Sequence, residues 1–134
     1  MPLDALATIV HGTTVGTNAL LERKGARIAL VTTAGFADVL EMRRRDRPRT
    51  WGLWGTFEPV VPRDLRFEIA ERTRADGTVL ARPEPADIAA LVARLRDADV
   101  EAVAVCLINA YANPDNERLL VEALRAAWPA PALP

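Results

Sequence analysis

Residues 100–108, VEAVAVCLI, decide the fold class of this chain. Their apolar side chains follow one another without alternation, which is typical of a strand in a parallel sheet that is covered on both faces. The segment before them begins at Pro85 and carries apolar residues at helical spacing, namely Ile88, Leu91, Val92 and Leu95. The segment after them begins at Asn113-Pro114 and has the apolar positions Leu120, Val121, Leu124 and Trp128. A buried strand between two amphipathic helices predicts an α/β fold.

The amino-terminal part repeats this alternation of strand and helix. Ala7–Val10 is a short apolar run that suits a buried strand, and residues 13–24 form a predicted helix. Thr13 or Thr14 is expected to cap this helix, and Gly25 is expected to end it in the left-handed conformation.

Two further strands and a hairpin complete the predicted fold. Arg27–Thr33 is a second buried strand, after which Gly35 turns the chain into a short helix at about residues 36–43. Arg66–Arg72 alternates like a strand, and Asp76-Gly77 is a strong hairpin turn. Together these elements predict a single domain, residues 1–134, with a mixed sheet, flanking helices and a β-hairpin excursion.

The composition excludes several classes of site. The chain has 134 residues, a formal net charge of −1, one cysteine, Cys106, and one histidine, His11. The charge gives no indication of nucleic-acid or membrane binding, and a cysteine cluster or a multi-histidine zinc site is impossible, so no metal ligands are assigned. No apolar run approaches the roughly twenty residues that span a bilayer, and the first ten residues lack signal-peptide features. We therefore expect a cytoplasmic domain.

Residues 11–22, HGTTVGTNALLE, hold the first group of candidate site residues. A strand ends there, a glycine allows a sharp turn, and hydroxyl groups crowd the start of a helix, where free backbone N–H groups attract phosphate or carboxylate. The candidate substrate- or phosphate-binding residues are His11, Gly12, Thr13, Thr14 and Asn18. The alternative is structural: the two threonines only cap the helix, and the histidine makes one structural hydrogen bond.

Arginines in residues 43–49 form the second group. Arg44 and Arg47 are candidates to bind a carboxylate, carbonyl or phosphate through paired N–H groups. The alternative is a solvated or inter-domain surface loop, in which these arginines pair with Asp46 and Glu41.

Other polar residues have weaker functional interpretations. Asp38 and Glu41 are candidate general bases without an evident partner, and no catalytic residue is assigned. Cys106 is expected to be a small buried apolar residue. Three residues follow the carboxyl end of a strand and could reach a cleft, although capping of the next helix is a sufficient role for the last of them: Asn109, Tyr111 and Asn113.

The order of these motifs resembles one family. Residues 11–26 are similar to the segment HGTTVATNALLERKGA of the hydantoinase A/5-oxoprolinase family, and residues 30–41 are similar to its LVTTxGFxDVLEI. The likeness continues through Arg47-Pro48, residues 101–106 and residues 111–117, so it covers nearly the whole chain in the right order.

This resemblance implies part of an actin-like (ribonuclease H-like) ATPase lobe. Its implied activity is ATP-dependent opening of a lactam or imide ring, with ATP and Mg²⁺ as cofactors, a small cyclic amide as substrate, and a partner subunit or further domains. One alternative is a subunit of an acetone-carboxylase-like enzyme, and another is a non-catalytic binding or assembly module.

The family's usual glycine-rich segment, GVDVGGTFTD, has no counterpart here. Because that segment cradles phosphates in the family, the resemblance implies a fragment of a longer protein that does not hydrolyse ATP by itself.

Overall fold

The computed structural model describes residues 14–23, 25–42 and 58–128. Its centre is a parallel sheet of three strands in the order β2-β1-β5, formed by Arg66–Ile69, Ile28–Thr33 and Ala102–Cys106. β1 lies in the middle, where Leu30 pairs with Arg66 on one side and with Ala104 on the other. This arrangement confirms the α/β class.

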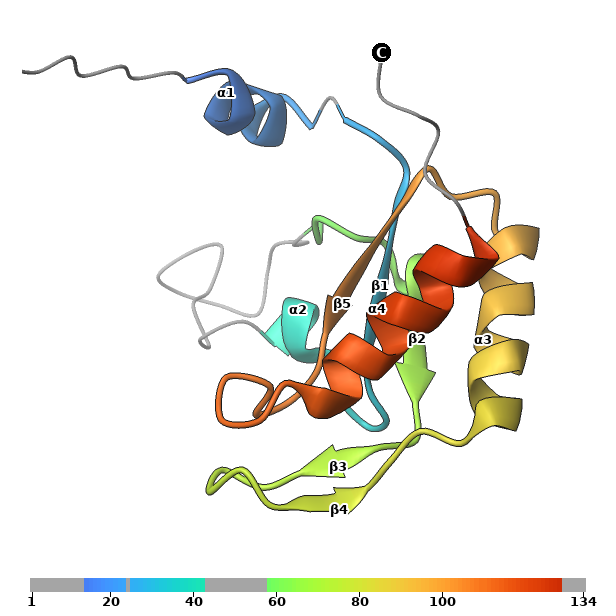
Figure 1. Ribbon diagram of the computed structural model, residues 1–134. Coiled ribbons are helices and arrows are strands. Elements are labelled where there is room, and N and C mark those ends of the chain that lie inside the picture. The colour runs from blue at the N-terminus through green and yellow to red at the C-terminus, as the bar shows by residue number, and fades with distance from the viewer. Residues whose placement is uncertain (1–13, 24, 43–57, 129–134) are drawn as a thin grey trace, which may run out of the picture.

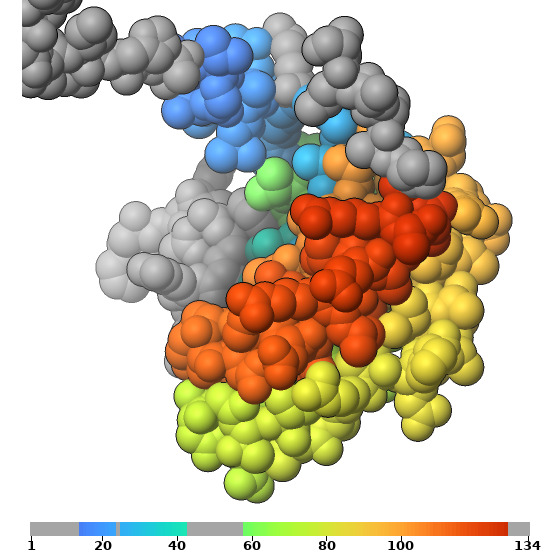
Figure 2. Space-filling view, in the orientation of Figure 1, coloured from blue at the N-terminus to red at the C-terminus, as the bar shows by residue number. Residues whose placement is uncertain are grey.

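Two long helices cover one face of this sheet (Figure 1). They are α3, Pro85–Asp97, and α4, Asp115–Ala127, which contact each other and the strands beneath them. Figure 2 shows the two helices packed side by side above the hairpin. The predicted helical spacing is confirmed, because the core between sheet and helices contains Ala29, Val31, Phe67, Ile69, Leu91, Leu95, Leu120 and Leu124.

Shorter elements complete the described part of the chain. They are α1, Val15–Leu21; α2, Val39–Met42; the 3-10 helix η2, Arg63–Leu65; and the antiparallel strands β3, Arg72–Thr73, and β4, Val79–Ala81. None of the helices in the described ranges is long and apolar enough to cross a membrane.

The predicted hairpin at Asp76-Gly77 is confirmed, but the single strand predicted at Arg66–Arg72 is wrong. Gly77 has a φ of +85°, and Arg74 N donates to Thr78 O at 2.9 Å across the turn. The predicted strand is two strands, because β2 pairs with β1 and only β3 belongs to the hairpin. Ala70 and Glu71 lie between these two strands, and Glu71 is buried.

The prediction that the VEAVAVCLI strand is covered on both faces is also wrong. Val103 and Val105 pack against the core beneath the helices. Ala102, Ala104 and Cys106 point to the opposite face and are exposed. β5 is an edge strand of the described sheet, and no described element covers this face of it, so Cys106 is not the buried residue that the apolar run predicts.

The first helix is shorter than predicted. α1 begins after Thr14, whose side chain makes no capping hydrogen bond, and every residue of the helix is exposed. Arg23, with a φ of 53°, adopts the left-handed conformation predicted for Gly25. The predicted strand Ala7–Val10 lies outside the described residues.

Candidate functional site

The candidate site is the turn at the carboxyl end of β1, because ligands of open α/β sheets bind beside such ends. Gly35 has a φ of +86°, which glycine adopts without steric strain. Phe36 N donates to Thr33 O at 3.1 Å, and Ala34 N donates to Ile69 O at 3.0 Å. The prediction that Gly35 turns the chain towards a helix is confirmed.

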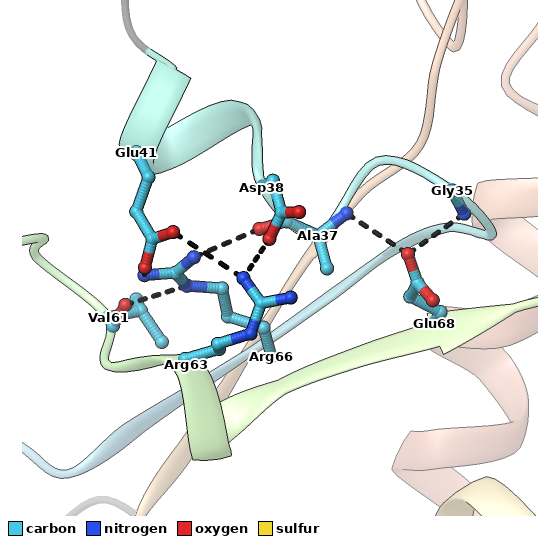
Figure 3. A network of polar contacts seen from close by, with 8 residues as sticks. All are labelled: Gly35, Ala37, Asp38, Glu41, Val61, Arg63, Arg66 and Glu68. Carbon is cyan, nitrogen blue, oxygen red and sulfur yellow. Dashed lines mark hydrogen bonds and ion pairs between the residues drawn. The ribbon is translucent and has the colours of Figure 1, made fainter.

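Glu68 of β2 holds this turn against the sheet (Figure 3). Its Oε1 accepts hydrogen bonds from Gly35 N at 2.8 Å and from Ala37 N at 3.1 Å. A carboxylate that accepts two backbone N–H groups forms charge-assisted bonds, which are stronger than neutral ones. The conformation of the turn therefore depends on a side chain from the neighbouring strand.

Arg66 of β2 is the most deeply buried charge of the site. Its side chain has no exposed surface, yet all three of its guanidinium nitrogens donate hydrogen bonds. Nε donates to Val61 O at 2.9 Å, Nη1 to Ala37 O at 3.1 Å, and Nη2 to Glu41 Oε1 at 3.1 Å. A buried charge is tolerated when it is paired and hydrogen-bonded, as each of these nitrogens is, so Arg66 joins β2, α2 and the segment before η2.

Arg63 of η2 makes a second, exposed connection to the same loop. It donates to the Asp38 carboxylate and, at 3.4 Å, to Glu41 Oε2. The hydrogen bond to Asp38 and the charge of that carboxylate raise the pKa of the Arg63 guanidinium above its usual value. Asp38 and Glu41, the candidate general bases, are thus both bound by arginines, an arrangement that favours a role in fixing the loop.

A buried polar network lies beside this turn and joins the sheet to the hairpin. Glu71 accepts a hydrogen bond from the Thr33 hydroxyl, and Asn116 Nδ2 donates to Glu71 Oε2 at 2.8 Å and to Ala81 O at 2.9 Å. Thr33 in turn accepts from Ile108 N at 3.0 Å. None of these residues is among the candidates predicted from the sequence; the only sequence signal of the network is a glutamate in the strand-like alternation that precedes the hairpin.

The three polar residues predicted to follow a strand have different positions. Asn109 Nδ2 donates to Thr73 O at 2.8 Å. Asn113 Oδ1 accepts from Asp115 N at 3.0 Å, at the first residue of α4. The cap position of α4 is Pro114, one residue after the predicted Asn113, although Asn113 still binds the first N–H of the helix. Tyr111 points to solvent with 83% of its surface exposed.

Most of the predicted site residues lie outside the described residues, namely His11, Gly12, Thr13, Arg44 and Arg47. Thr14, directly before α1, and Asn18, on α1, are described and exposed, and α1 precedes β1 at its amino end (Figure 1). These two residues are therefore not brought next to the turn that follows β1.

One contact connects the end of α1 with the segment before η2. Arg23, directly after α1, donates to Glu58 O at 2.6 Å and to Pro59 O at 3.4 Å.

The described residues offer no metal site. In these ranges, no group of three or more histidine, cysteine, aspartate or glutamate side chains is placed to hold a metal ion. The carboxylates of the Figure 3 network already bind arginines or backbone N–H groups.

Comparison with known proteins identifies related chains. Residues 2–128 match the family model described as the hydantoinase/oxoprolinase N-terminal region. The chain is 34% identical to caprolactamase subunit alpha of Pseudomonas jessenii, over 90% of this chain and 18% of the relative. It is 35% identical to 5-oxoprolinase 1 of Arabidopsis thaliana, over 87% of this chain and 11% of the relative. The chain thus spans less than a fifth of the length of these relatives.

Solved structures of two such proteins have the same fold. The crystal structure of the ATP-dependent caprolactamase from Pseudomonas jessenii matches 88% of this chain and 18% of its own, with a TM-score of 0.74 and 34% identity. A nucleotide-free structure of acetone carboxylase matches 81% of this chain and 17% of its own, with a TM-score of 0.72 and 25% identity.

Proposed function

This chain belongs to the hydantoinase/oxoprolinase family, and on that premise we propose that it is part of an ATP-dependent enzyme that opens the ring of a cyclic amide. The observation that carries this proposal is the match of 88% of the chain to the structure of an ATP-dependent caprolactamase. The substrate class is a lactam or an imide. The alternative is an ATP-dependent ketone carboxylase, and the similar match to acetone carboxylase supports it.

In the proposed reaction ATP supplies a phosphoryl group that activates the amide carbonyl. The catalytic task of the protein is then to position the reactants and to neutralise developing negative charge. We assign that task to Arg44 and Arg47, together with His11, Gly12, Thr13, Thr14 and Asn18. The support for the arginines is chemical, because a guanidinium neutralises negative charge through paired N–H groups.

Apart from the contacts assigned to Thr14 and Asn18, we place the binding of ATP and Mg²⁺ outside the described residues. Two observations support this assignment: no described group of side chains fits a metal ion, and the carboxylates of the Figure 3 network are already bound. The described fold would then contribute a scaffold, while other parts of a longer protein contribute the nucleotide site. Because one relative is a subunit alpha, we propose that the protein has a partner subunit or further domains. Because the proposed reaction consumes ATP, we also propose a cytoplasmic location.

The test is phosphate release by the full protein in Mg-ATP with caprolactam, 5-oxoproline or hydantoin. We expect one of these cyclic amides to stimulate phosphate release without bicarbonate. Arg47→Gln should lower this activity at least about tenfold, as expected for the loss of a charge-assisted contact to the reacting group, whereas Arg118→Gln, an exposed position on α4, should not. Fixation of labelled bicarbonate into a ketone, with no response to any cyclic amide, would replace the hydrolase with the carboxylase.

A further inference from the structure

A groove lies along the free edge of β5, on the side of the sheet that α4 covers. It is separate from the turn at the carboxyl end of β1. The groove has a volume of about 330 Å³ and lies between the edge of β5 and α4. Apolar side chains make up most of its lining, contributed by Val103 and Val105 of the strand and by Val121, Leu124 and Trp128 of the helix and its end.

The chemistry of the groove does not suit a small polar ligand. Glu101 and Arg125 are its charged lining residues. The Glu101 carboxylate already accepts a hydrogen bond from Arg27 N at 2.6 Å, which leaves Arg125 as the charged group that could bind such a ligand. Sites for small molecules usually combine an apolar wall with several converging polar groups, and this lining lacks them.

The backbone of β5 suggests a different occupant. β1 pairs with one side of β5, and within the described residues no strand pairs with its other side. An unpaired strand edge presents free N–H and C=O groups that form hydrogen bonds with an added strand. An apolar groove beside such an edge suits the side chains of that added strand.

The topology indicates which part of the chain supplies the strand. α3 carries the chain from the β2 side of the sheet across β1 to β5, and α4 packs on the same face. Strand-helix-strand crossovers in parallel sheets are almost always right-handed. A second crossover of the same hand on the same face moves in the same direction, so it places the next strand at the free edge of β5.

The lengths of the two elements agree with this path. α4 has 13 residues and spans about 20 Å at 1.5 Å per residue, and β5 has five residues and spans about 17 Å. α4 therefore returns the chain to the amino end of β5, where Trp128 lines the same groove as Val100. Arg96 Nη2 donates to Ala127 O at 2.6 Å and fixes the end of the helix there.

We propose that the free edge of β5 and this groove receive a β-strand formed by the polypeptide that follows α4, parallel to β5. The matched family model is an N-terminal region, and most of each relative lies outside the stretch that this chain matches. The proposal does not depend on the proposed enzymatic function.

The test uses the full 134-residue chain with a probe strand appended after Pro134, consisting of about six alternating valine and threonine residues, a usual strand length. The matched control replaces alternate probe residues with proline, which cannot donate to a strand pair. Hydrogen exchange by NMR is measured at the β5 amides that do not bond to β1. We expect the probe to slow their exchange at least about tenfold and the proline control to leave it unchanged.

Two variants then locate the contact. Val121→Ser alters the groove and should abolish the slowing, whereas Ala126→Ser, at an exposed position of α4 outside the groove lining, should preserve it. Equal exchange with the probe and with its proline control would overturn the proposal. Protection of the β5 amides without the probe would also overturn it in two cases. If light scattering shows a dimer, a second copy occupies the edge. If deletion of residues 1–10 removes the protection, the amino-terminal segment occupies it.

Discussion

Replacement of Arg66 by methionine is the sharpest test of the network that holds the β1 turn. The substitution keeps an unbranched side chain but removes a guanidinium that binds Glu41, Ala37 O and Val61 O. Removing one partner of a buried ion pair typically costs about 3–5 kcal/mol, and Glu41 is 41% exposed, so water partly replaces its lost partner. We therefore expect a loss of about 2–4 kcal/mol in the free energy of unfolding.

The assay is urea unfolding followed by circular dichroism, with Arg63→Met as the matched control. Arg63 binds Asp38 and Glu41 from an exposed position, where solvent and salt screen an ion pair, so its replacement should cost much less. Added salt should reduce the effect of Arg63→Met more than that of Arg66→Met. If the two variants lose the same stability, or if Arg66→Met unfolds at the wild-type midpoint, Arg66 does not hold this turn as described.

Three further predictions follow from other contacts of the described fold. Glu71→Ala should lose about 2–4 kcal/mol in urea unfolding, because the buried donors of Thr33 and Asn116 lose their acceptor; an unchanged midpoint would contradict this role. The hydrogen bond from Thr78 N lowers the pKa of Asp76 below 3.8, so the charged carboxylate stabilises the fold above that pH, and this stabilisation is lost as the pH falls through the lowered pKa. The melting temperatures of the wild type and of Asp76→Asn should therefore converge in acid. A difference in melting temperature that does not change with pH would contradict this prediction. Cys106 is exposed, so a thiol reagent should modify it completely in the native chain, and a requirement for denaturant would show that this sheet face is covered.

The sequence predicted those elements whose signals are local. The spacing of Leu91 and Leu95, and of Leu120 and Leu124, predicted α3 and α4 because a helix buries one face at a fixed period, and these four side chains are in the core. Asp76-Gly77 predicted the hairpin because its turn geometry depends on those two residues and their neighbours.

Other features depend on distant parts of the chain and could not be predicted in this way. Glu71 is buried and bonded to Thr33 and Asn116, which are 38 and 45 residues away in sequence. The exposure of Cys106 depends on which element covers the face of β5 opposite to α3 and α4. A run of apolar residues does not indicate whether such an element is present. Among the described residues, the arginines that bind Asp38 and Glu41 come from η2 and β2.

The candidate site shows the same division. The turn at Gly35 was predicted from a single residue, whereas its attachment to Arg66 and Glu68 required knowledge of strand order. The alternation of Arg66 and Glu68 with Phe67 and Ile69 does place the two charges on one face of a strand, a signal that could have pointed to this network.

The most direct test of the proposed function is isothermal titration with Mg-ATP of two chains, measured side by side. The first is the 134-residue chain, and the second is a longer chain that also carries an upstream glycine-rich segment of the GVDVGGTFTD type. We predict that only the longer chain binds Mg-ATP, because the described residues provide no site for the metal and the turn carboxylates are bound to arginines. Failure of both chains to bind would contradict the ATP-dependent assignment.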